Sequence, residues 1–354
     1  MDIYIVGGAV RDTLLGHVPK DRDYVVVGSS ADEMLAGGFR QVGKDFPVFL
    51  HPETQDEYAL ARTERKSGHG YGGFTVNTEA VTLEEDLSRR DITINSMAMT
   101  PEGELVDPFG GAKDLADKTI RHTTLAFCED PLRILRVARF LARFGPQWRI
   151  ASETEELIHK MVTAGEADFL VPERVWIELE KGLMEPYPVL MLQTLVRFGL
   201  VRRPPFAEYN QANACYFEQL QAASAAGEAL EVRFALAFSR LWTTEEAKES
   251  RIPALAREVS AIVCRLSEMV ASAGDATPEL LLKLLMAADA LRQKERFKLV
   301  SQAFGFLSPQ WATRLQSAQQ KVLSVNTTDV VKPGLKGPEI QERIREARLS
   351  ALTA

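Results

Sequence analysis

The hydrophobic pattern of the chain changes near residue 119, and this change limits the folds that are open to it. Before that point, short runs rich in β-branched residues alternate with glycine-containing turns, which is typical of buried strands. The predicted strands are residues 3–6, 24–27, 48–50 and 58–61. Residues 9–15 have the pattern of a helix that begins after the Gly7-Gly8 turn. Beyond residue 119 the apolar residues recur at helical spacing.

Prolines and glycines mark the boundaries of the helical part. Pro131 begins a predicted helix that runs to residue 144, where Gly145-Pro146 ends it, and Pro172 begins another. A chain of 354 residues is long enough for two or three domains. We therefore predict an α/β head at residues 1–118, followed by mostly α-helical segments at residues 119–185 and 186–354.

The charge balance restricts the partners that the chain can hold. It has 42 Lys and Arg residues against 49 Asp and Glu residues, a formal net charge of −7. This argues against a basic coat that holds nucleic acid anywhere, so a polyanion has to be held by a local patch. The three cysteines have no CxxC spacing, which fits a reducing cytoplasm and excludes a Cys-based zinc site. No apolar run approaches the roughly 18 residues of a membrane span, so we expect a cytoplasmic protein.

The first chemical signal combines a glycine turn with paired carboxylates. Gly7-Gly8 lies between a predicted strand and helix, where backbone N–H groups can approach an anion closely, and Arg11 can add a charge-assisted contact to a phosphate. Asp21 and Asp23 flank one residue at the start of a strand, so the period of two is expected to place both on one face. Such a pair beside a phosphate site suggests Mg²⁺ held jointly with a triphosphate. The alternative is a tight turn with two surface acids.

At these residues the sequence resembles the nucleotidyltransferases of the DNA-polymerase-β type, specifically the class II CCA-adding tRNA nucleotidyltransferases. Four later blocks, which with the first cover about residues 3–180, are similar to motifs of that family in the family's order. They are Arg89-Arg90-Asp91-Ile92-Thr93-Ile94-Asn95, Asp107-Pro108-Phe109-Gly110-Gly111, Glu129-Asp130-Pro131-Leu132-Arg133 and Glu173-Arg174-Val175-Trp176-Ile177-Glu178. The resemblance implies a mixed-sheet head, a neck at residues 119–185, and a helical body and tail.

The resemblance also implies roles for individual residues. Asp21 and Asp23 would bind two Mg²⁺ ions, which activate the attacking hydroxyl and neutralise the leaving pyrophosphate. Gly8, Arg11 and Arg90 would hold the triphosphate. The family further expects a third carboxylate on a neighbouring strand to assist proton removal from the 3′-hydroxyl. Glu57 is the candidate for it, although an ordinary surface residue of a strand would give the same pattern.

The helix at residues 131–144 is the most informative part of the resemblance. It carries arginines at three- and four-residue spacing along one side, namely Arg133, Arg136, Arg139 and Arg143. Such a stripe is usually a solvated face. In the family, however, the pair that corresponds to Asp130 and Arg133 reads the base, accepting C or A and rejecting G and U. Arg136 and Arg139 would then contact phosphate and ribose.

Two further stretches bear on the range of activities. Residues 63–74 contain four glycines and resemble the loop that the family needs for adding the terminal A. Longer bacterial relatives carry a phosphohydrolase domain marked by a His-Asp doublet, whereas Phe238-Ser239 stands at the comparable place here. The resemblance therefore implies a degenerate phosphohydrolase region that serves as scaffold or as a tRNA-binding body.

The sequence as a whole predicts an enzyme that adds CCA to the 3′ end of tRNA from CTP and ATP. It implies no obligate protein partner. The alternatives are an A-adding enzyme or poly(A) polymerase, which share the head, and an inactive tRNA- or nucleotide-binding module. The low overall charge favours selective binding of a folded tRNA over open-ended tailing.

Overall fold

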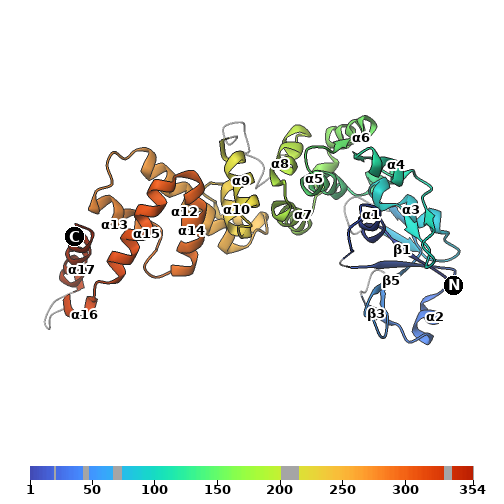
Figure 1. The fold of residues 1–354 in the computed structure, drawn as a ribbon, viewed down its shortest axis with the longest axis horizontal. Coiled ribbons are helices and arrows are strands. Elements are labelled where there is room, and N and C mark those ends of the chain that lie inside the picture. Colours follow the sequence, from blue (N-terminus) through green and yellow to red (C-terminus); the bar gives the residue numbers. More distant parts are fainter. Residues whose placement is uncertain (20, 43–47, 67–73, 201–214, 331–336, 354) are drawn as a thin grey trace. The chain divides into compact units, whose positions relative to one another are not determined.

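A computed structural model describes residues 1–19, 21–42, 48–66, 74–200, 215–330 and 337–353. The chain divides into two compact units (Figure 1). The first comprises Met1–Glu178 and Leu190–Leu200, and the second comprises Leu179–Val189 and Val201–Ala354. The predicted head and most of the predicted neck thus belong to the first unit.

The first unit is built on a mixed seven-stranded sheet, as the α/β prediction requires. Its strand order is β3-β4-β5-β2-β1-β8-β9, and β2 and β5 run parallel while the other neighbours are antiparallel. The strands are β1 (Asp2–Val6), β2 (Asp23–Val27), β3 (Arg40–Val42), β4 (Val48–Leu50), β5 (Glu57–Leu60), β8 (Ala98–Met99) and β9 (Leu105–Val106). All four strands predicted from the sequence are confirmed to within one residue at either end.

Helices and short ladders complete this unit. The helices and single 3-10 turns are α1 (Gly8–Leu14), α2 (Ala31–Ala36), α3 (Leu83–Ser88), η1 (Thr93–Asn95), α4 (Gly111–Ala116), η2 (Leu125–Glu129), α5 (Leu132–Phe144), α6 (Ser152–Thr163), η3 (Glu166–Phe169), α7 (Pro172–Met184) and α8 (Pro188–Arg197). The small ladders pair β6 (Thr63–Lys66) with β7 (Phe74–Asn77) and β10 (Thr119–Ile120) with β11 (Arg149–Ile150). The ladder of β10 and β11 lies in the segment predicted as helical. The sequence did not predict it, because strands of two residues leave no periodic pattern.

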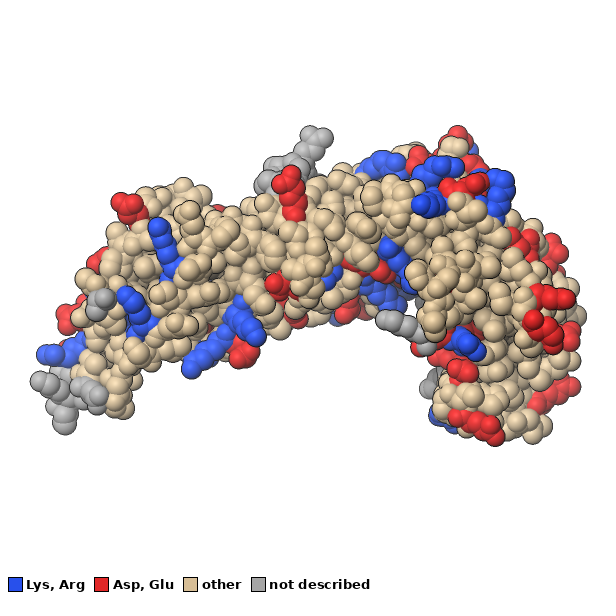
Figure 2. All heavy atoms as spheres, viewed as in Figure 1, with Lys and Arg blue, Asp and Glu red and all other residues tan. Residues whose placement is uncertain are grey.

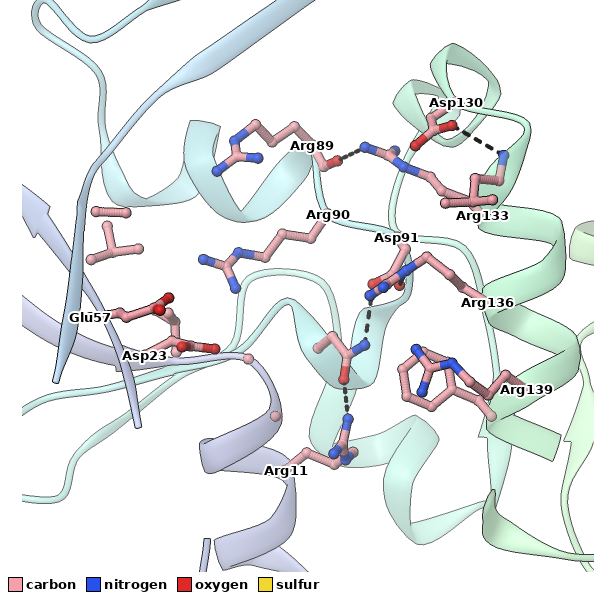
Figure 3. Close-up of a pocket in the computed structure, with 18 of the residues that line it drawn as sticks. Arg11, Asp23, Glu57, Arg89, Arg90, Asp91, Asp130, Arg133, Arg136 and Arg139 are labelled. Carbon is pink, nitrogen blue, oxygen red and sulfur yellow. Dashed lines mark hydrogen bonds and ion pairs between the residues drawn. The ribbon is translucent and has the colours of Figure 1, made fainter. Parts of the chain in front are cut away.

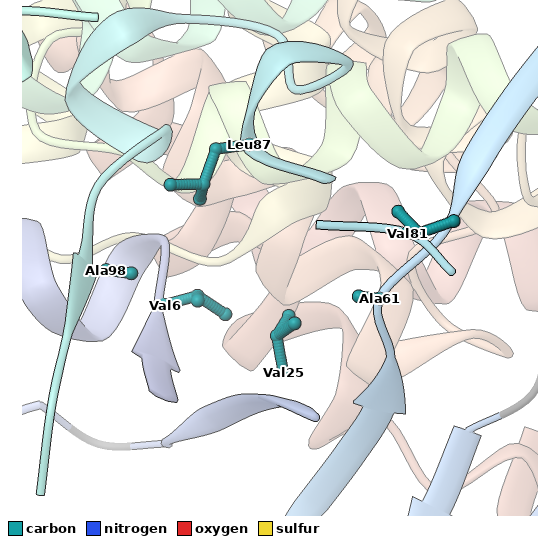
Figure 4. Packing of buried hydrophobic residues seen from close by; sticks show 6 residues of the cluster. All are labelled: Val6, Val25, Ala61, Val81, Leu87 and Ala98. Carbon is teal, nitrogen blue, oxygen red and sulfur yellow. The ribbon is translucent and has the colours of Figure 1, made fainter. Parts of the chain in front are cut away.

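Both faces of the sheet are covered, because successive residues of each strand point to opposite sides. On one face, Val25 packs with Val6, Ala98 and Leu87 of α3 (Figure 4). On the other face, Val26 packs with Phe49 and with Met34 of α2. The sheet is therefore held between two apolar layers. The site described below lies where β1 ends at Val6 and β2 begins at Asp23.

In its described residues the second unit consists of helices. They are the end of α7, α9 (Cys215–Ala225), α10 (Leu230–Ala237), α11 (Thr244–Glu249), α12 (Ala254–Ala271), α13 (Pro278–Ala287), α14 (Lys294–Leu307), α15 (Pro309–Leu323), α16 (Thr327–Val330) and α17 (Gly337–Thr353). The predicted amphipathic stretch at residues 280–286 is confirmed as part of α13. Phe238, at the position where the resemblance expects a histidine in longer relatives, is buried against Phe234.

The surface agrees with the charge argument. On the face of α12 to α17 that Figure 2 shows, Lys and Arg side chains are spread singly and do not form a continuous basic patch. Within the described part of the chain, no helix combines the length and the hydrophobicity that crossing a membrane requires.

Candidate active site

A pocket of about 580 Å³ opens in the first unit where the Gly7-Gly8 turn, β2, β5 and α5 meet. Four carboxylates are among the described residues that line it, namely Asp23, Glu57, Asp91 and Asp130. Nine arginines line it as well: Arg11, Arg62, Arg89, Arg90, Arg133, Arg136, Arg139, Arg143 and Arg174. This pocket is therefore the kind of local basic patch that a polyanion would need on a chain of net negative charge. Its guanidinium groups suit the recognition of phosphates and bases.

Two of the carboxylates lie side by side at one end of the pocket. Asp23 is the first residue of β2 and Glu57 the first of β5, and the two are directly paired in the parallel register. Figure 3 shows both side chains together, facing Arg90 across the pocket. Desolvation and the neighbouring Asp21 raise the pKa of Asp23, while the Arg90 charge acts against them. The parallel pairing brings Glu57 to the position predicted for a third carboxylate.

Asp21 differs from the prediction in its local structure. The strand begins at Asp23, so Asp21 lies in a bend before β2 and not on its face, and it does not line the pocket. The reason is the length of β1: its last residue, Val6, pairs with Asp23, and the chain turns at Gly7. Asp21 is near enough for its charge to act on Asp23.

These carboxylates fit a metal that is shared with a substrate. Within the described residues, no three His, Cys, Asp or Glu side chains form a group that could hold an ion by themselves. Mg²⁺ is commonly held by one or two carboxylates together with substrate phosphates, which does not require a complete protein cage. Asp23 in the pocket, and Asp21 two residues before it in the chain, offer hard oxygen donors of the kind that such a site needs.

The glycine turn allows guanidinium groups to approach the backbone. Gly7 has a φ of +69°, and a Cβ there would lie 3.0 Å from Nη1 of Arg90. A Cβ on Gly8 would lie 3.4 Å from Nη2 of Arg11. Both glycines line the pocket, so the turn, Arg90 and Arg11 form one continuous surface.

Arg11 lines the pocket but is held from several sides. Its Nη1 donates to Oδ1 of Asn95 at 2.5 Å, and its Nε donates to Oδ1 of Asp12 at 2.9 Å. The guanidinium carbon lies 5.5 Å from the ring centres of both Phe140 and Phe144. Burial lowers the pKa of Arg11, although Asp12 opposes that shift. Arg11, which was predicted to contact a phosphate, is thus a buried cation whose side chain is already held in place by protein groups.

The predicted base-reading residues, Asp130 and Arg133, both line the pocket, but each has other partners. Arg174 donates to both carboxylate oxygens of Asp130, at 3.2 and 2.7 Å. Arg133 donates through Nη1 to the carbonyl of Ala126 at 2.8 Å and through Nη2 to the carbonyl of Arg89 at 2.5 Å (Figure 3). These contacts hold both side chains in place in the pocket wall. Arg174 was not predicted as a site residue, because 44 residues separate it from Asp130.

The next two arginines of α5 are held by buried acids. Arg136 donates to Asp91 at 2.7 Å, and Arg139 donates to Glu178 of α7 at 2.6 Å. Arg136 also lies 3.6 Å from Glu178. The ring of Phe140 lies 4.9 Å from the guanidinium carbon of Arg139, which adds a cation–π contact. Both predicted nucleotide contacts therefore line the pocket as ordered side chains.

The buried Asp91 gives a pH-dependent prediction. Burial by itself would raise the pKa of Asp91, but Arg136 outweighs this and the pKa falls to about 2. A depressed pKa stabilises the folded state above the ordinary carboxyl pKa, and that stability is lost as pH falls toward 2. This contribution of Asp91 to the free energy of unfolding is about 2 kcal/mol.

We therefore expect the free energy of unfolding of the native chain to exceed that of an Asp91→Asn variant at pH 6. The difference between the two free energies is expected to narrow below pH 4. Urea unfolding at a series of pH values measures it, and a gap independent of pH would contradict the assignment.

Behind the pocket, three acids each hold two arginines, an arrangement that the sequence reasoning missed. Asp12 pairs with Arg11 and Arg143, Asp86 with Arg89 and Arg90, and Glu178 with Arg136 and Arg139. The first two were detectable in principle, since Asp12 adjoins Arg11 and Asp86 precedes two arginines by three and four residues. Glu178 had no local signal. Of the predicted loop at residues 63–74, residues 67–73 lie outside the described part.

Comparisons with known proteins identify relatives of this chain. The family described as "Poly A polymerase head domain" matches residues 3–121, and "Probable RNA and SrmB- binding site of polymerase A" matches residues 148–208. The CCA-adding enzyme of Bordetella bronchiseptica is 46% identical over 354 residues, 99% of this chain and 96% of that protein. The multifunctional CCA protein of Azoarcus sp. is 42% identical over 401 residues, 100% of this chain and 97% of that protein. A solved structure of a CCA-adding enzyme with ATP is 25% identical, with a TM-score of 0.73, over 99% of this chain and 86% of that one.

Proposed function

This chain belongs to the family of CCA-adding tRNA nucleotidyltransferases, and we propose that the pocket of its first unit is the active site. The enzyme adds C, C and A to the 3′ end of tRNA from CTP and ATP and releases pyrophosphate. The observation that carries the assignment of the site is the pairing of Asp23 with Glu57, opposite Arg90 and beside the Gly7-Gly8 turn. Carboxylates for a metal and guanidiniums for a triphosphate thus share one pocket.

The reaction forms a bond between the 3′-oxygen of the tRNA and the α-phosphorus of the nucleotide. The bond from that phosphorus to the bridging oxygen breaks, and pyrophosphate leaves. In this proposal Asp21 and Asp23 would hold two Mg²⁺ ions, which would supply polarisation of the attacking hydroxyl and offset the charge of the leaving group. Glu57 accepts the hydroxyl proton, because its carboxylate is next to Asp23 and reaches the pocket.

The arginines divide between the triphosphate and the nucleoside. Gly8 and Arg90 contact the triphosphate, and Arg11, held by Asn95, adds its charge from beneath the turn. Asp130 and Arg133 read the base edge, while Arg174 keeps the Asp130 carboxylate in position. Complementary hydrogen bonding selects C and A, because a wrong base leaves polar groups unpaired. Arg136 and Arg139 complete the nucleotide pocket.

The division of labour along the chain follows from these positions. Residues 1–118 supply the carboxylates, residues 119–185 supply the base-reading and anchoring groups, and residues 186–354 bind tRNA by shape. The match of residues 148–208 to a family described as an RNA-binding site supports RNA contact by that part of the chain. Because tRNA is its substrate and its cysteines suit a reducing compartment, we infer a cytoplasmic location.

The experiment offers the purified enzyme three tRNAs, which end in the discriminator base, in C and in CC, with each nucleoside triphosphate separately. We expect CMP incorporation into the first two, AMP incorporation into the third, and no incorporation of GMP or UMP. Extension of the CC-ended tRNA alone, and only with ATP, would establish an A-adding enzyme. Continued AMP addition would establish a poly(A) polymerase, and no incorporation would leave a binding module.

A further inference from the structure

The carboxylate of Asp86 lies behind the pocket and gathers three of its arginines. The side chain is fully buried in the short helix α3 and does not line the pocket. Its Oδ1 accepts from Nη2 of Arg89 at 2.6 Å and from the backbone N–H of Arg62 at 3.2 Å. Its Oδ2 accepts from Nη2 of Arg90 at 3.0 Å and from Nε at 3.3 Å. One buried acid thus connects α3 to the segment after β5 and to both arginines that follow α3.

These contacts fix the direction of the Arg90 guanidinium. Its Nε and Nη2 are engaged by Asp86, so the planar group presents its Nη1 side to the Gly7 turn. Figure 3 shows the Arg90 side chain extended toward Asp23 and Glu57. A guanidinium held in this way loses little conformational freedom when it binds an anion.

Asp86 stays charged in this environment. Burial by itself would raise the pKa of Asp86, but Arg90 and Arg89 outweigh that effect and hold the pKa below its usual value. A buried acid of this kind is stable only while its hydrogen bonds are made. The arginines therefore stabilise the charged form of Asp86, and Asp86 in turn restricts the positions of their guanidinium groups.

We propose that Asp86 is a positioning residue for nucleotide binding, which acts through Arg90 on the triphosphate common to CTP and ATP. The proposal rests on the proposed function for the identity of the ligand. Because the contact is to the triphosphate and not to the base, Asp86 affects CTP and ATP alike. The base-reading pair Asp130 and Arg133 instead governs the choice between nucleotides.

The substitution Asp86→Asn tests the proposal, because two effects of the loss of the carboxylate change anion affinity in opposite directions. One is the removal of a negative charge, and the other is the loss of the contact that orients Arg90. Removing a negative charge near an anion site should by itself tighten anion binding. Loss of the carboxylate that orients Arg90 should weaken it, by about tenfold if one charge-assisted contact is lost. We expect the dissociation constants of inorganic tripolyphosphate, CTP and ATP, measured by titration calorimetry, to rise together. Unchanged or tighter binding by the folded variant overturns the proposal.

Three further variants separate positioning from general damage. Asp114→Asn is the matched control, since Asp114 is also buried and ion-paired, but with Arg121, which does not line the pocket. We expect it to retain native affinity, and an equal loss there overturns the proposal. Asp86→Glu keeps the charge but shifts it by one methylene, so weaker binding is expected even if Asp86→Asn does not fold, and native affinity overturns the proposal.

The last variant tests whether Asp86 acts through Arg90. In an Arg90→Gln background, Asp86→Asn is expected to cause no further loss of tripolyphosphate affinity, because contacts in one network are not additive. Independent, multiplying losses would show that Asp86 acts by another route. The proposed function is judged separately, since native enzyme that binds tripolyphosphate but extends no tRNA contradicts the function and leaves the role of Asp86 intact.

Discussion

Replacing Asp23 by Asn is expected to abolish nucleotide addition while leaving the fold and tRNA binding almost unchanged. The carboxylate supplies a charged oxygen donor where the pocket meets β2, and a neutral amide of the same size cannot hold a divalent cation against a triphosphate. The expected loss is about a thousandfold or more, because metal-assisted charge stabilisation contributes several kcal/mol and each 1.36 kcal/mol is tenfold in rate. Single-turnover incorporation of CMP and AMP measures it, and Asp21→Ala is expected to show a loss of the same kind.

The control for this experiment is Asp32→Asn. Asp32 is an exposed acid in the first turn of α2 and does not line the pocket. It should keep the native rate, and all variants should bind tRNA as the native enzyme does in a filter-binding assay. Incorporation by Asp23→Asn within tenfold of the native rate would refute the metal assignment.

The second large effect concerns stability and arises at Gly111. A Cβ at this position would lie 2.3 Å from the carbonyl oxygen of Thr93 and 2.8 Å from Cγ of Met97. The nearest obstacle is backbone, which cannot rotate away, so Gly111→Ala forces η1 and α4 apart. We expect the free energy of unfolding to fall by about 3 kcal/mol, the upper end of the usual cost of overpacking. Urea unfolding followed by tryptophan fluorescence measures the change.

Gly110 supplies the matched control because its constraint is different. It has a φ of +74°, and nothing lies within 4 Å of a Cβ built on it. Gly110→Ala therefore meets only the left-handed backbone penalty, about 1–2 kcal/mol. Equal losses for the two variants would contradict the packing argument. Gly111 is the point where α4 packs directly on the turn at Thr93.

The local features of the catalytic end were predictable from the sequence. Runs of β-branched residues, the Gly7-Gly8 turn and the acids at 21 and 23 involve neighbours in the chain, so their patterns survive in the fold. Glu57 was predicted from the resemblance, and it faces the pocket because the parallel pairing of β5 with β2 sets Glu57 against Asp23. The error at Asp21 came from assuming that the strand extends two residues beyond the end of its partner.

What the sequence by itself determined was the position of four strands of the large sheet, the change to mostly helical structure near residue 119, and the inventory of charged groups. What only the tertiary structure decided was which groups hold one another. Arg174 meets Asp130 across 44 residues, Arg136 meets Asp91 across 45, and Arg139 meets Glu178 across 39. No periodicity encodes such pairings, because a side chain's long-range partner depends on how separate elements pack. The sequence therefore predicted a row of arginines on one helix, and the tertiary structure placed buried acids where they fix the orientation of those arginines.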